Sequence, residues 1–592
     1  MAITGTLPLM GPEAAIELMQ VVLGRARADL VIVNARLANV YTGELLDNQA
    51  IAVKGKWIAY VGREPEDNIG VETTVIDAQG MTVIPGLIDG HTHLGNAYNA
   101  AEVLRYVMKG GTTTLIAEMM DPYPVAGYEG VLDFLASFQD QPVKVFGTVP
   151  ANVSISQACN GISLETLRKL LQRDDIVGLG ESYWQALLQN PDQLLPLYEE
   201  TLRCGKTVEG HSAGASRRKL MAYAAAGVSS CHEPTNAEEV LERLRLGIYV
   251  MVREGSVRSE LDDVCRLKDM GVDLRRLTLV TDGTDPKDLY RHGHMNRIVQ
   301  KAIDVGFEPM DAVRMATLNI AEHFSLDGLL GGIAPGKYAD MLVIPDIKTI
   351  DARYVISMGK VVAKDGEVLI APRKPVYAMS SRHTVNLPGE FKPEDFLISV
   401  AGGVSSLKVR VIDQVTELVT KELHLDLPVR DGEIKADRSI DIVKVAAIDR
   451  THNPGKKFVG LLRGWHMQAG AFATSGVWDA SDIVCVGVGD ADMALAVNRI
   501  RELQGGIVVV QGGKIVAEIP LPIFGVISDL PMESLVDGME AIEAALKVLG
   551  VRLSNPCLTI LTLTTPAIPY LRICEEGLVN LKEGKTLGLV VE

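Results

Sequence analysis

The spacing of apolar positions changes character along the chain. From about residue 28 to 82, short β-branched runs such as ADLVIVNARL and AIAVKGKWIAYVG are separated by Gly, Asn and Asp turn clusters, a pattern typical of a small β-sheet. From residue 83 to 335, brief apolar runs alternate with amphipathic stretches of helix length. This alternation predicts parallel β/α units.

Eight apolar runs in the second stretch fit strands, and each precedes a segment that fits a helix. Two such helices are predicted over AAEVLRYVMKG (residues 100–110) and AEEVLERLRLG (residues 237–247). The strand candidates span residues 83–94, 112–119, 144–151, 175–182, 206–212, 227–234, 247–256 and 277–283. Eight consecutive units predict an α/β fold, a closed (β/α)8 barrel of the TIM type.

Short apolar runs typical of β-strands occur again after the barrel, in YADMLVIPD and ARYVISMGKVVAKDGEVL. We expect this segment to complete the first sheet, with the barrel inserted between the two parts. The last stretch has its own strand and helix patterns, including SDIVCVGVG and MALAVNRIRELQGG. The predicted organisation is an N-terminal helical extension (1–27), a β-sheet domain in two parts (28–82 and 336–382), the barrel (83–335) and a C-terminal α+β domain (383–592).

Length and composition narrow the class of protein. With 592 residues, 47% of them hydrophobic, the chain is long enough for several cores. No apolar run reaches the roughly 18 to 20 residues of a membrane span, and no signal peptide pattern opens the sequence. The seven cysteines are scattered and form no C-x-x-C pair, which argues against disulfides and thiolate zinc sites. We therefore expect a cytoplasmic protein without a membrane partner.

Charge narrows the choice of partner. A formal net charge of −17 repels phosphate backbones, and no basic stripe with interleaved aromatic residues is present, so nucleic acid is excluded as a partner. A small neutral or weakly charged substrate is favoured. Large acidic enzymes of this kind are commonly symmetric, and we expect a homo-oligomer, a dimer being the commonest form.

The strongest local motif is Gly90-His91-Thr92-His93, which ends an apolar run. Side chains two positions apart on a strand point the same way, so both imidazoles face one spot at the barrel mouth. Taken alone, the motif could also be two unrelated polar residues at a strand end. Other strands decide between these interpretations.

Four later strand candidates also end in side chains that can bind a metal: Glu181 in GLGES, His211 in EGHS, His232 in SCHE and Asp282 in VTDG. The carboxyl ends of TIM-barrel strands form the catalytic face, so these groups should converge with the two-histidine strand. A lone buried histidine is more often a satisfied core residue. Six nitrogen and oxygen ligands placed by one topological rule instead predict a metal site.

Six protein ligands exceed what one catalytic ion takes while it keeps an open position, which predicts two divalent ions about 3.5 to 4 Å apart. Imidazole and carboxylate ligands suit manganese, iron or zinc. With Glu181 and Asp282 as the only charged ligands, the site stays net positive and favours a metal-bridging hydroxide as nucleophile. Asp282 is then the candidate proton carrier between hydroxide and leaving nitrogen, or a ligand only.

The constellation with PGLIDGHTH resembles that of the amidohydrolase superfamily. Longer stretches are similar to the adenine deaminase family of bacteria and archaea, among them MATLNIAEHFSL, GGIAPGKYAD, GDADMALAVNRIRELQGGIVVV and PLPIFGVISDLP. The resemblance covers nearly the whole chain after Ala28. It implies hydrolytic deamination of adenine to hypoxanthine and ammonia with manganese or iron, and it implies that Glu181 bridges the metals in place of a carboxylated lysine.

The chain departs from the family pattern where a substrate would be touched. Strand two ends in Glu118-Met119-Met120-Asp121 instead of an Asp-Pro-His-Glu-like sequence. The C-terminal segment Trp478-Asp479-Ala480-Ser481-Asp482 replaces a His-Asp-Ser-His-Asn-like one, and Asp282 is followed by Gly283 instead of a second acidic residue. These changes leave open a divergent amidohydrolase that acts on another cyclic amide or amino-heterocycle.

Three further residues are candidates for substrate binding. Arg253 and Glu254 end strand seven, although a structural Arg–Glu pair under the barrel rim is the competing interpretation. Trp478 could stack on a flat heterocycle or pack in the core. A third hypothesis, a barrel kept as an interaction module without turnover, predicts no bound metal and no effect of changing Asp282.

Overall fold

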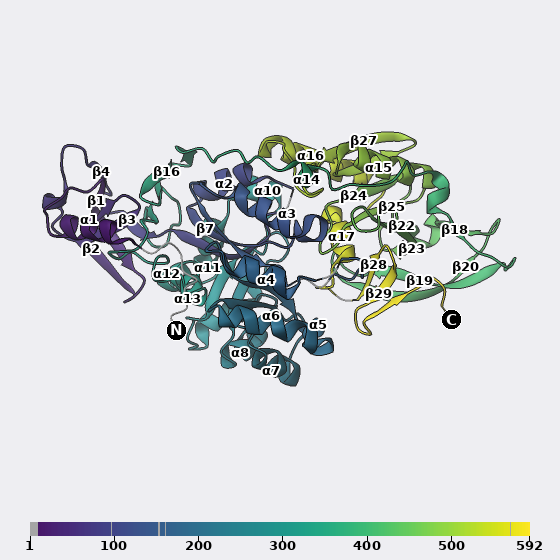
Figure 1. Cartoon of the computed structure of the whole chain (residues 1–592), viewed down its shortest axis with the longest axis horizontal. Coiled ribbons are helices and arrows are strands. Elements are labelled where there is room, and N and C mark those ends of the chain that lie inside the picture. Colours follow the sequence, from purple (N-terminus) through teal and green to yellow (C-terminus); the bar gives the residue numbers. More distant parts are fainter. Residues whose placement is uncertain (1–9, 96, 152–153, 160, 569, 592) are drawn as a thin grey trace.

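The computed structural model describes residues 10–95, 97–151, 154–159, 161–568 and 570–591. These residues form an elongated molecule in which a small sheet, a central α/β region and a C-terminal region follow one another along the long axis (Figure 1). None of the helices in these ranges is long and apolar enough to cross a membrane.

Both flanks of the central region contribute strands to one nine-stranded sheet. Its strands are β1 (Leu30–Asn39), β2 (Glu44–Lys54), β3 (Trp57–Gly62), β4 (Thr74–Asp77), β5 (Thr82–Pro85), β14 (Met341–Ile344), β15 (Tyr354–Ser357), β16 (Lys360–Lys364) and β17 (Glu367–Val368). The junction is the antiparallel pair of β5 and β14, in which Val83 lies opposite Val343. The alternating β-branched residues seen in the sequence fill the core of this sheet.

Helix α1 (Pro12–Val22) packs beside this sheet, and η1 (Glu66–Asn68) follows β3. Residues 10–27 of the predicted extension contain one helix, and residues 1–9 lie outside the described residues. The other predicted domain boundaries stay predictions.

The central region contains eight strands, and each overlaps one of the eight runs predicted from the sequence. They are β6 (Leu87–Thr92), β7 (Thr112–Glu118), β8 (Lys144–Val149), β9 (Ile176–Tyr183), β10 (Thr207–His211), β11 (Ser230–Cys231), β12 (Tyr249–Arg253) and β13 (Leu277–Val280). The ladders are parallel and form a five-stranded sheet, β10-β9-β8-β7-β6, and a three-stranded sheet, β11-β12-β13. Within each of the two sheets, the carboxyl ends of all strands therefore point in one direction.

Two backbone hydrogen bonds join the five-stranded sheet to the three-stranded one, one between β10 and β11 and one between β13 and β6. The amide of Ser229, before β11, donates to Val208 O on β10 at 2.9 Å, and the amide of Asp282, after β13, donates to His91 O on β6 at 3.0 Å. The second bond ties the last strand to the first at the level of the candidate ligands.

Helices follow the strands, and several begin at a side chain that caps the free amides of the first turn, as Asn99 and Asn236 do. The helices are α2 (Ala100–Lys109), α3 (Tyr123–Ser137), α4 (Leu164–Leu171), α5 (Trp184–Gln189), α6 (Pro191–Arg203), α7 (Arg217–Ala225), α8 (Ala237–Arg245), α9 (Leu261–Val264), η2 (Cys265–Asp269), α10 (Pro286–His292), α11 (Met295–Asp304), α12 (Pro309–Met315) and α13 (Leu318–His323). The two helices predicted after strands one and six are α2 and α8.

The C-terminal region is built on an eight-stranded mixed sheet, β20-β19-β23-β22-β25-β24-β26-β27. Its strands are β19 (Ser406–Gln414), β20 (Thr420–Pro428), β22 (Ile442–Asp449), β23 (Lys457–Arg463), β24 (Ala471–Thr474), β25 (Asp482–Gly487), β26 (Gly506–Gln511) and β27 (Lys514–Pro520). Shorter strands flank it: β18 (Ile398–Ser399), β21 (Glu433–Ile434), β28 (Leu571–Cys574), β29 (Gly577–Asn580) and β30 (Lys585–Leu587).

The helices of this region are α14 (Met379–Arg382), η3 (Pro393–Phe396), η4 (Arg438–Ile440), α15 (Asp490–Leu503), α16 (Met532–Val548), α17 (Pro556–Leu561) and η5 (Thr562–Thr564). Helices α15 and α16 pack against the strands at the β27 end of the sheet.

Direct contacts hold the C-terminal region against the central one. The amide of Ser528 donates to Ala97 O at 2.7 Å, Asn99 Nδ2 donates to Ser528 O at 3.2 Å, and the Met532 amide donates to Glu102 Oε2 at 3.0 Å. Ala97 and Asn99 follow β6, so the C-terminal region lies over the carboxyl end of the first central strand.

Candidate metal centre

All six predicted ligands lie at the carboxyl ends of the central strands and are buried. His91 is the second-last residue of β6, and His93 directly follows that strand. Glu181 is near the end of β9, and His211 ends β10. His232 directly follows β11, and Asp282 follows β13. We call these six residues the His–carboxylate cluster.

Glu181 lies at the centre of the cluster and contacts all four histidines. Its Oε1 is 3.3 Å from His91 Nε2, 3.2 Å from His93 Nε2 and 3.3 Å from His232 Nε2. Its Oε2 is 3.2 Å from His211 Nδ1. One oxygen of this carboxylate thus faces three imidazoles and the other faces one. A carboxylate that bridges two cations needs such a placement between two groups of ligands.

Asp282 divides its two oxygens between the cluster and an arginine. Oδ1 lies 3.2 Å from His91 Nε2 and 3.5 Å from His93 Nε2. Oδ2 accepts a hydrogen bond from Arg253 Nη1 at 3.1 Å. Arg253 also holds Glu260 through two hydrogen bonds of 2.6 and 3.1 Å. The backbone of Asp282 is left-handed, with φ 58°, an uncommon conformation that Asp tolerates better than most residues.

The donor set fits divalent cations. Ligand atoms of His91, Glu181, His232 and Asp282 all lie within 4.8 Å of one another, and those of His211, His232 and Glu233 form a second such group. His211 Nδ1 and Glu233 Oε1 are buried and lie 3.1 Å apart. Imidazole and carboxylate without thiolate is a ligand set that manganese, iron and zinc accept.

The electrostatics of the cluster point the same way. Burial raises the pKa of Glu181, but His232 and His211 overcome it and hold that pKa well below its ordinary value. Burial lowers the pKa of His232, but Glu233 and Glu181 raise it well above its usual range. Glu181 and Glu233 therefore favour positive charge on His232, and a divalent cation at the cluster would supply such a charge in place of a proton.

Two further carboxylates join the cluster that were not among the predicted ligands. Glu233 Oε1 lies 3.1 Å from His211 Nδ1 and 2.8 Å from His232 Nε2. Glu118 ends β7, with Oε1 3.6 Å from His91 Nδ1 and Oε2 accepting from the Glu181 amide at 3.4 Å. A Cβ at Gly180 would lie 2.1 Å from Glu118 Oε2, so only glycine leaves room for this carboxylate.

A cavity of about 200 Å³ opens beside the cluster between the central and C-terminal regions, and we call it the polar cavity because charged side chains of the cluster lie in its wall. Met120 and Asp121, which follow β7, line its central side. The C-terminal region contributes Trp478, Asp479 and Thr565. The Trp478 ring lies nearly parallel to the His93 imidazole, at 17°, with centroids 5.9 Å apart. A flat substrate in this cavity would contact the candidate metal ligands on one side and the Trp478 ring on the other.

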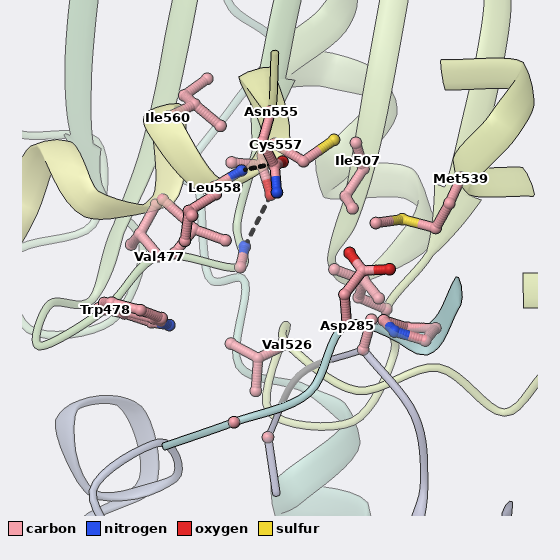
Figure 2. A pocket seen from close by; sticks show the side chains of 18 of the residues that line it. Asp285, Val477, Trp478, Ile507, Val526, Met539, Asn555, Cys557, Leu558 and Ile560 are labelled. Carbon is pink, nitrogen blue, oxygen red and sulfur yellow. Dashed lines mark hydrogen bonds between the residues drawn. The ribbon is translucent and has the colours of Figure 1, made fainter. Parts of the chain in front are cut away.

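A second, apolar cavity of about 90 Å³ shares Trp478, Asp121 and Val257 with the first. Figure 2 shows Trp478 at its edge, Ile507, Met539 and Ile560 around it, and the Asp285 carboxylate pointing into it. Burial raises the pKa of Asp285. The indole of Trp478 therefore contributes to the walls of both cavities.

Of the predicted substrate contacts, Arg253 and Trp478 line the polar cavity, and Glu254 does not. Glu254 is buried and accepts hydrogen bonds from Ser259 Oγ and the Leu261 amide, and Lys301 Nζ lies 2.8 Å from it. Its described contacts are therefore those of a structural residue. Its predicted contact with substrate stays a prediction.

Comparisons with known proteins cover nearly the whole chain. The model of the amidohydrolase family matches residues 82–368, and that of the adenine deaminase C-terminal domain matches residues 417–585. The adenine deaminase of Moorella thermoacetica is 37% identical over 99% of this chain and all of that protein. That of Clostridium botulinum is 35% identical over 98% of both chains, and that of Cenarchaeum symbiosum 34% identical over 97% of this chain and 94% of its own.

Proposed function

Because this chain belongs to the adenine deaminase family, we propose that it converts adenine, or a closely related aminopurine, to hypoxanthine and ammonia by hydrolysis. The observation that carries the proposal is the convergence of five candidate ligand side chains, distant in sequence, around the sixth, Glu181, at one wall of a cavity large enough for a small heterocycle. The reaction consumes one water, whose oxygen replaces the amino nitrogen on the ring carbon.

We propose that the His–carboxylate cluster binds two divalent cations. Manganese and iron are the preferred candidates, and zinc is the alternative. Two ligand groups that share His232 support a pair, with Glu181 reaching both sides. When bound, such cations supply Lewis acidity and make water a better nucleophile near neutral pH. Glu118 and Glu233 would orient the imidazoles and balance charge, as carboxylates next to metal-binding histidines commonly do.

Asp282 is the proposed proton carrier. In the reaction, water attacks the ring carbon that bears the amino group, a proton moves to the Asp282 carboxylate, and the same proton is passed to the leaving nitrogen, which departs as ammonia. Arg253 holds Asp282 Oδ2 at 3.1 Å and so fixes the direction of that carboxylate. Trp478 would stack on the base and keep bulk water from the reacting carbon.

We further infer that the eight central strands close into one barrel. The support is the pair of backbone hydrogen bonds that join β10 to β11 and β13 to β6 across the gaps between the two ladders. A C-terminal α+β domain over its mouth is part of the same proposal. The homodimer and the cytoplasmic location remain predictions from the sequence.

The test is cation depletion followed by reloading. Protein treated with a chelator is reloaded with manganese, ferrous iron or zinc, the bound metal per chain is measured by elemental analysis, and ammonia release and hypoxanthine formation from adenine are followed. We expect no turnover without metal and restored turnover with two equivalents of cation per chain. Turnover that is unaffected by complete depletion would refute the metal site.

The same assay decides between substrates. Met120, Asp121 and Trp478 line the cavity at the positions where the chain departs from the family pattern. For this reason substituted adenines, other amino-heterocycles and cyclic amides are included. If no purine is deaminated while another heterocycle is hydrolysed, the divergent amidohydrolase replaces the adenine assignment.

A further inference from the structure

Asp479 is a buried carboxylate whose hydrogen bonds are incomplete. It follows Trp478 in the loop between β24 and β25, and it lines the polar cavity together with ligands from the central region. Its Oδ2 accepts hydrogen bonds from Tyr183 Oη at 3.3 Å and from Thr565 Oγ1. Its Oδ1 is buried and has no hydrogen-bond partner among the described residues.

The loop that carries Asp479 is held in place from several sides. The Trp478 amide donates to Leu561 O at 3.1 Å, and Thr564 Oγ1 donates to Trp478 O at 2.6 Å. Asp479 itself has a left-handed φ of 59°. A buried carboxylate oxygen without a donor costs free energy, and a conformation that needs this many supports is more typical of a binding residue than of a packing residue.

The position of Asp479 also limits what its free oxygen can bind. Asp479, His93 and Glu181 line the same small cavity, and burial raises the pKa of Asp479 to about 7. A purine whose amino-bearing carbon meets the cluster directs its other ring toward the remaining walls. The imidazole half of a free purine carries one N–H, which is the donor that an open carboxylate oxygen lacks.

We propose that Asp479 is a substrate-binding residue whose Oδ1 accepts a hydrogen bond from the ring N–H in the imidazole half of the purine, while Trp478 covers the ring face. The proposal rests on the deaminase function above and narrows its substrate class to free bases that keep this N–H. A nucleoside has lost it to the sugar. The C-terminal region thereby selects the substrate that the central region transforms.

The experiment compares adenine with two oxazolopyrimidine isosteres, in each of which one ring N–H position is occupied by oxygen. For the metal-loaded wild type we expect kcat/KM to fall roughly 10- to 100-fold from adenine to the isosteres, the usual cost of leaving a buried polar atom without its hydrogen-bond partner. In Asp479→Ala we expect the value for adenine to fall by a similar factor and that for the isosteres to change less than about 3-fold. Discrimination then disappears.

Controls separate binding from support. Asp426→Asn changes an exposed carboxylate on β20 of the same sheet and should leave both substrates unaffected. Thr565→Val removes a donor to Oδ2 and leaves Oδ1 in place, so discrimination should persist. Metal content should be equal in all variants. If Asp479→Ala lowers kcat/KM equally for adenine and isosteres, or for neither, the proposal is overturned and Asp479 is a structural residue.

Failure of the deaminase function gives a different result. If wild-type protein releases no ammonia from adenine, that function fails, and the comparison is repeated with dissociation constants measured by calorimetry. Weaker binding of adenine, and not of the isosteres, in Asp479→Ala would still support the contact. Absence of adenine binding to the wild type would overturn both proposals.

Discussion

The two walls of the polar cavity are built in different ways. On the central side, histidines and carboxylates project from the ends of parallel strands, and each contacts at least one other member of the cluster. On the C-terminal side, Trp478 and Asp479 come from a single loop; Trp478 stacks beside His93 of the cluster, and Asp479 accepts a hydrogen bond from Tyr183, which is outside it. Under our proposals the strand ends carry out the reaction and the loop binds the substrate, so substitutions in the two walls should have different effects.

The largest effect is expected for Asp282→Asn, which removes a charged ligand and the proton carrier together. We expect kcat to fall by roughly 10² to 10⁴-fold, with a circular dichroism spectrum like that of the wild type. Asp365→Asn, on an exposed turn after β16, is the matched control and should be neutral. Wild-type turnover in Asp282→Asn would show that Asp282 does not take part in the reaction.

The second-largest effect is expected for Arg253→Met, which should lower both the free energy of unfolding and kcat. It leaves the buried carboxylates of Asp282 and Glu260 without their shared guanidinium. Breaking such a buried pair costs about 3 to 5 kcal/mol of unfolding free energy, and we expect kcat to fall by roughly 10- to 100-fold because Asp282 loses its orientation. Denaturant unfolding and steady-state kinetics measure the two effects.

Arg253→Lys gives a sharper result, because it keeps the charge and loses the two-pronged hydrogen bond. It should recover part of the stability and little of the rate. Equal recovery of both would show that the charge of Arg253 matters and its geometry does not.

Trp478→Ala tests the loop wall and should have a moderate effect. An aromatic contact contributes about 0.5 to 1.5 kcal/mol beyond burial, which corresponds to roughly a 2- to 10-fold loss of kcat/KM for adenine, mainly through KM. Bound metal should be unchanged, and Trp478→Phe should retain most of the activity. Loss of metal in Trp478→Ala would show that the two walls are not independent.

The smallest effect on catalysis is expected for Glu254→Gln. Glu254 is on the strand-end side but contacts Ser259, Leu261 and Lys301 and does not face the cavity. We expect kcat/KM within about 3-fold of wild type and a loss of roughly 1 to 3 kcal/mol in unfolding free energy. A larger loss of kcat/KM with unchanged stability would instead favour the substrate contact predicted from the sequence.

The candidate ligands could be found from the sequence because one rule covers them all. Each of the six stands at the carboxyl end of a recognisable apolar run, and parallel strands bring those ends together. The rule fails for Glu233, because alternation along a strand places neighbours on opposite faces. In the structure β11 ends at Cys231, so His232 and Glu233 are free of that alternation and both face inward.

Other parts of the site depend on contacts that no local pattern encodes. Glu118 was visible as a lone carboxylate in an apolar strand, yet its contact with His91 depends on the space left by Gly180 on the next strand. Asp479 belongs to a loop of another region, and its distance from the cluster follows from how the two regions pack. Glu254 shows the converse, since a strand-end position does not by itself direct a side chain into the cavity.

The junction between β5 and β14 has a consequence for the synthesis of this protein. When the ribosome has produced β1 to β5, the outer edge of β5 has no neighbour, and it gains one only after the entire central region has emerged and β14 follows. An unpaired strand edge of this kind invites pairing with another chain. Nascent chains stalled within the central region should therefore aggregate through this edge, and a chaperone that covers it would raise the yield of folded protein.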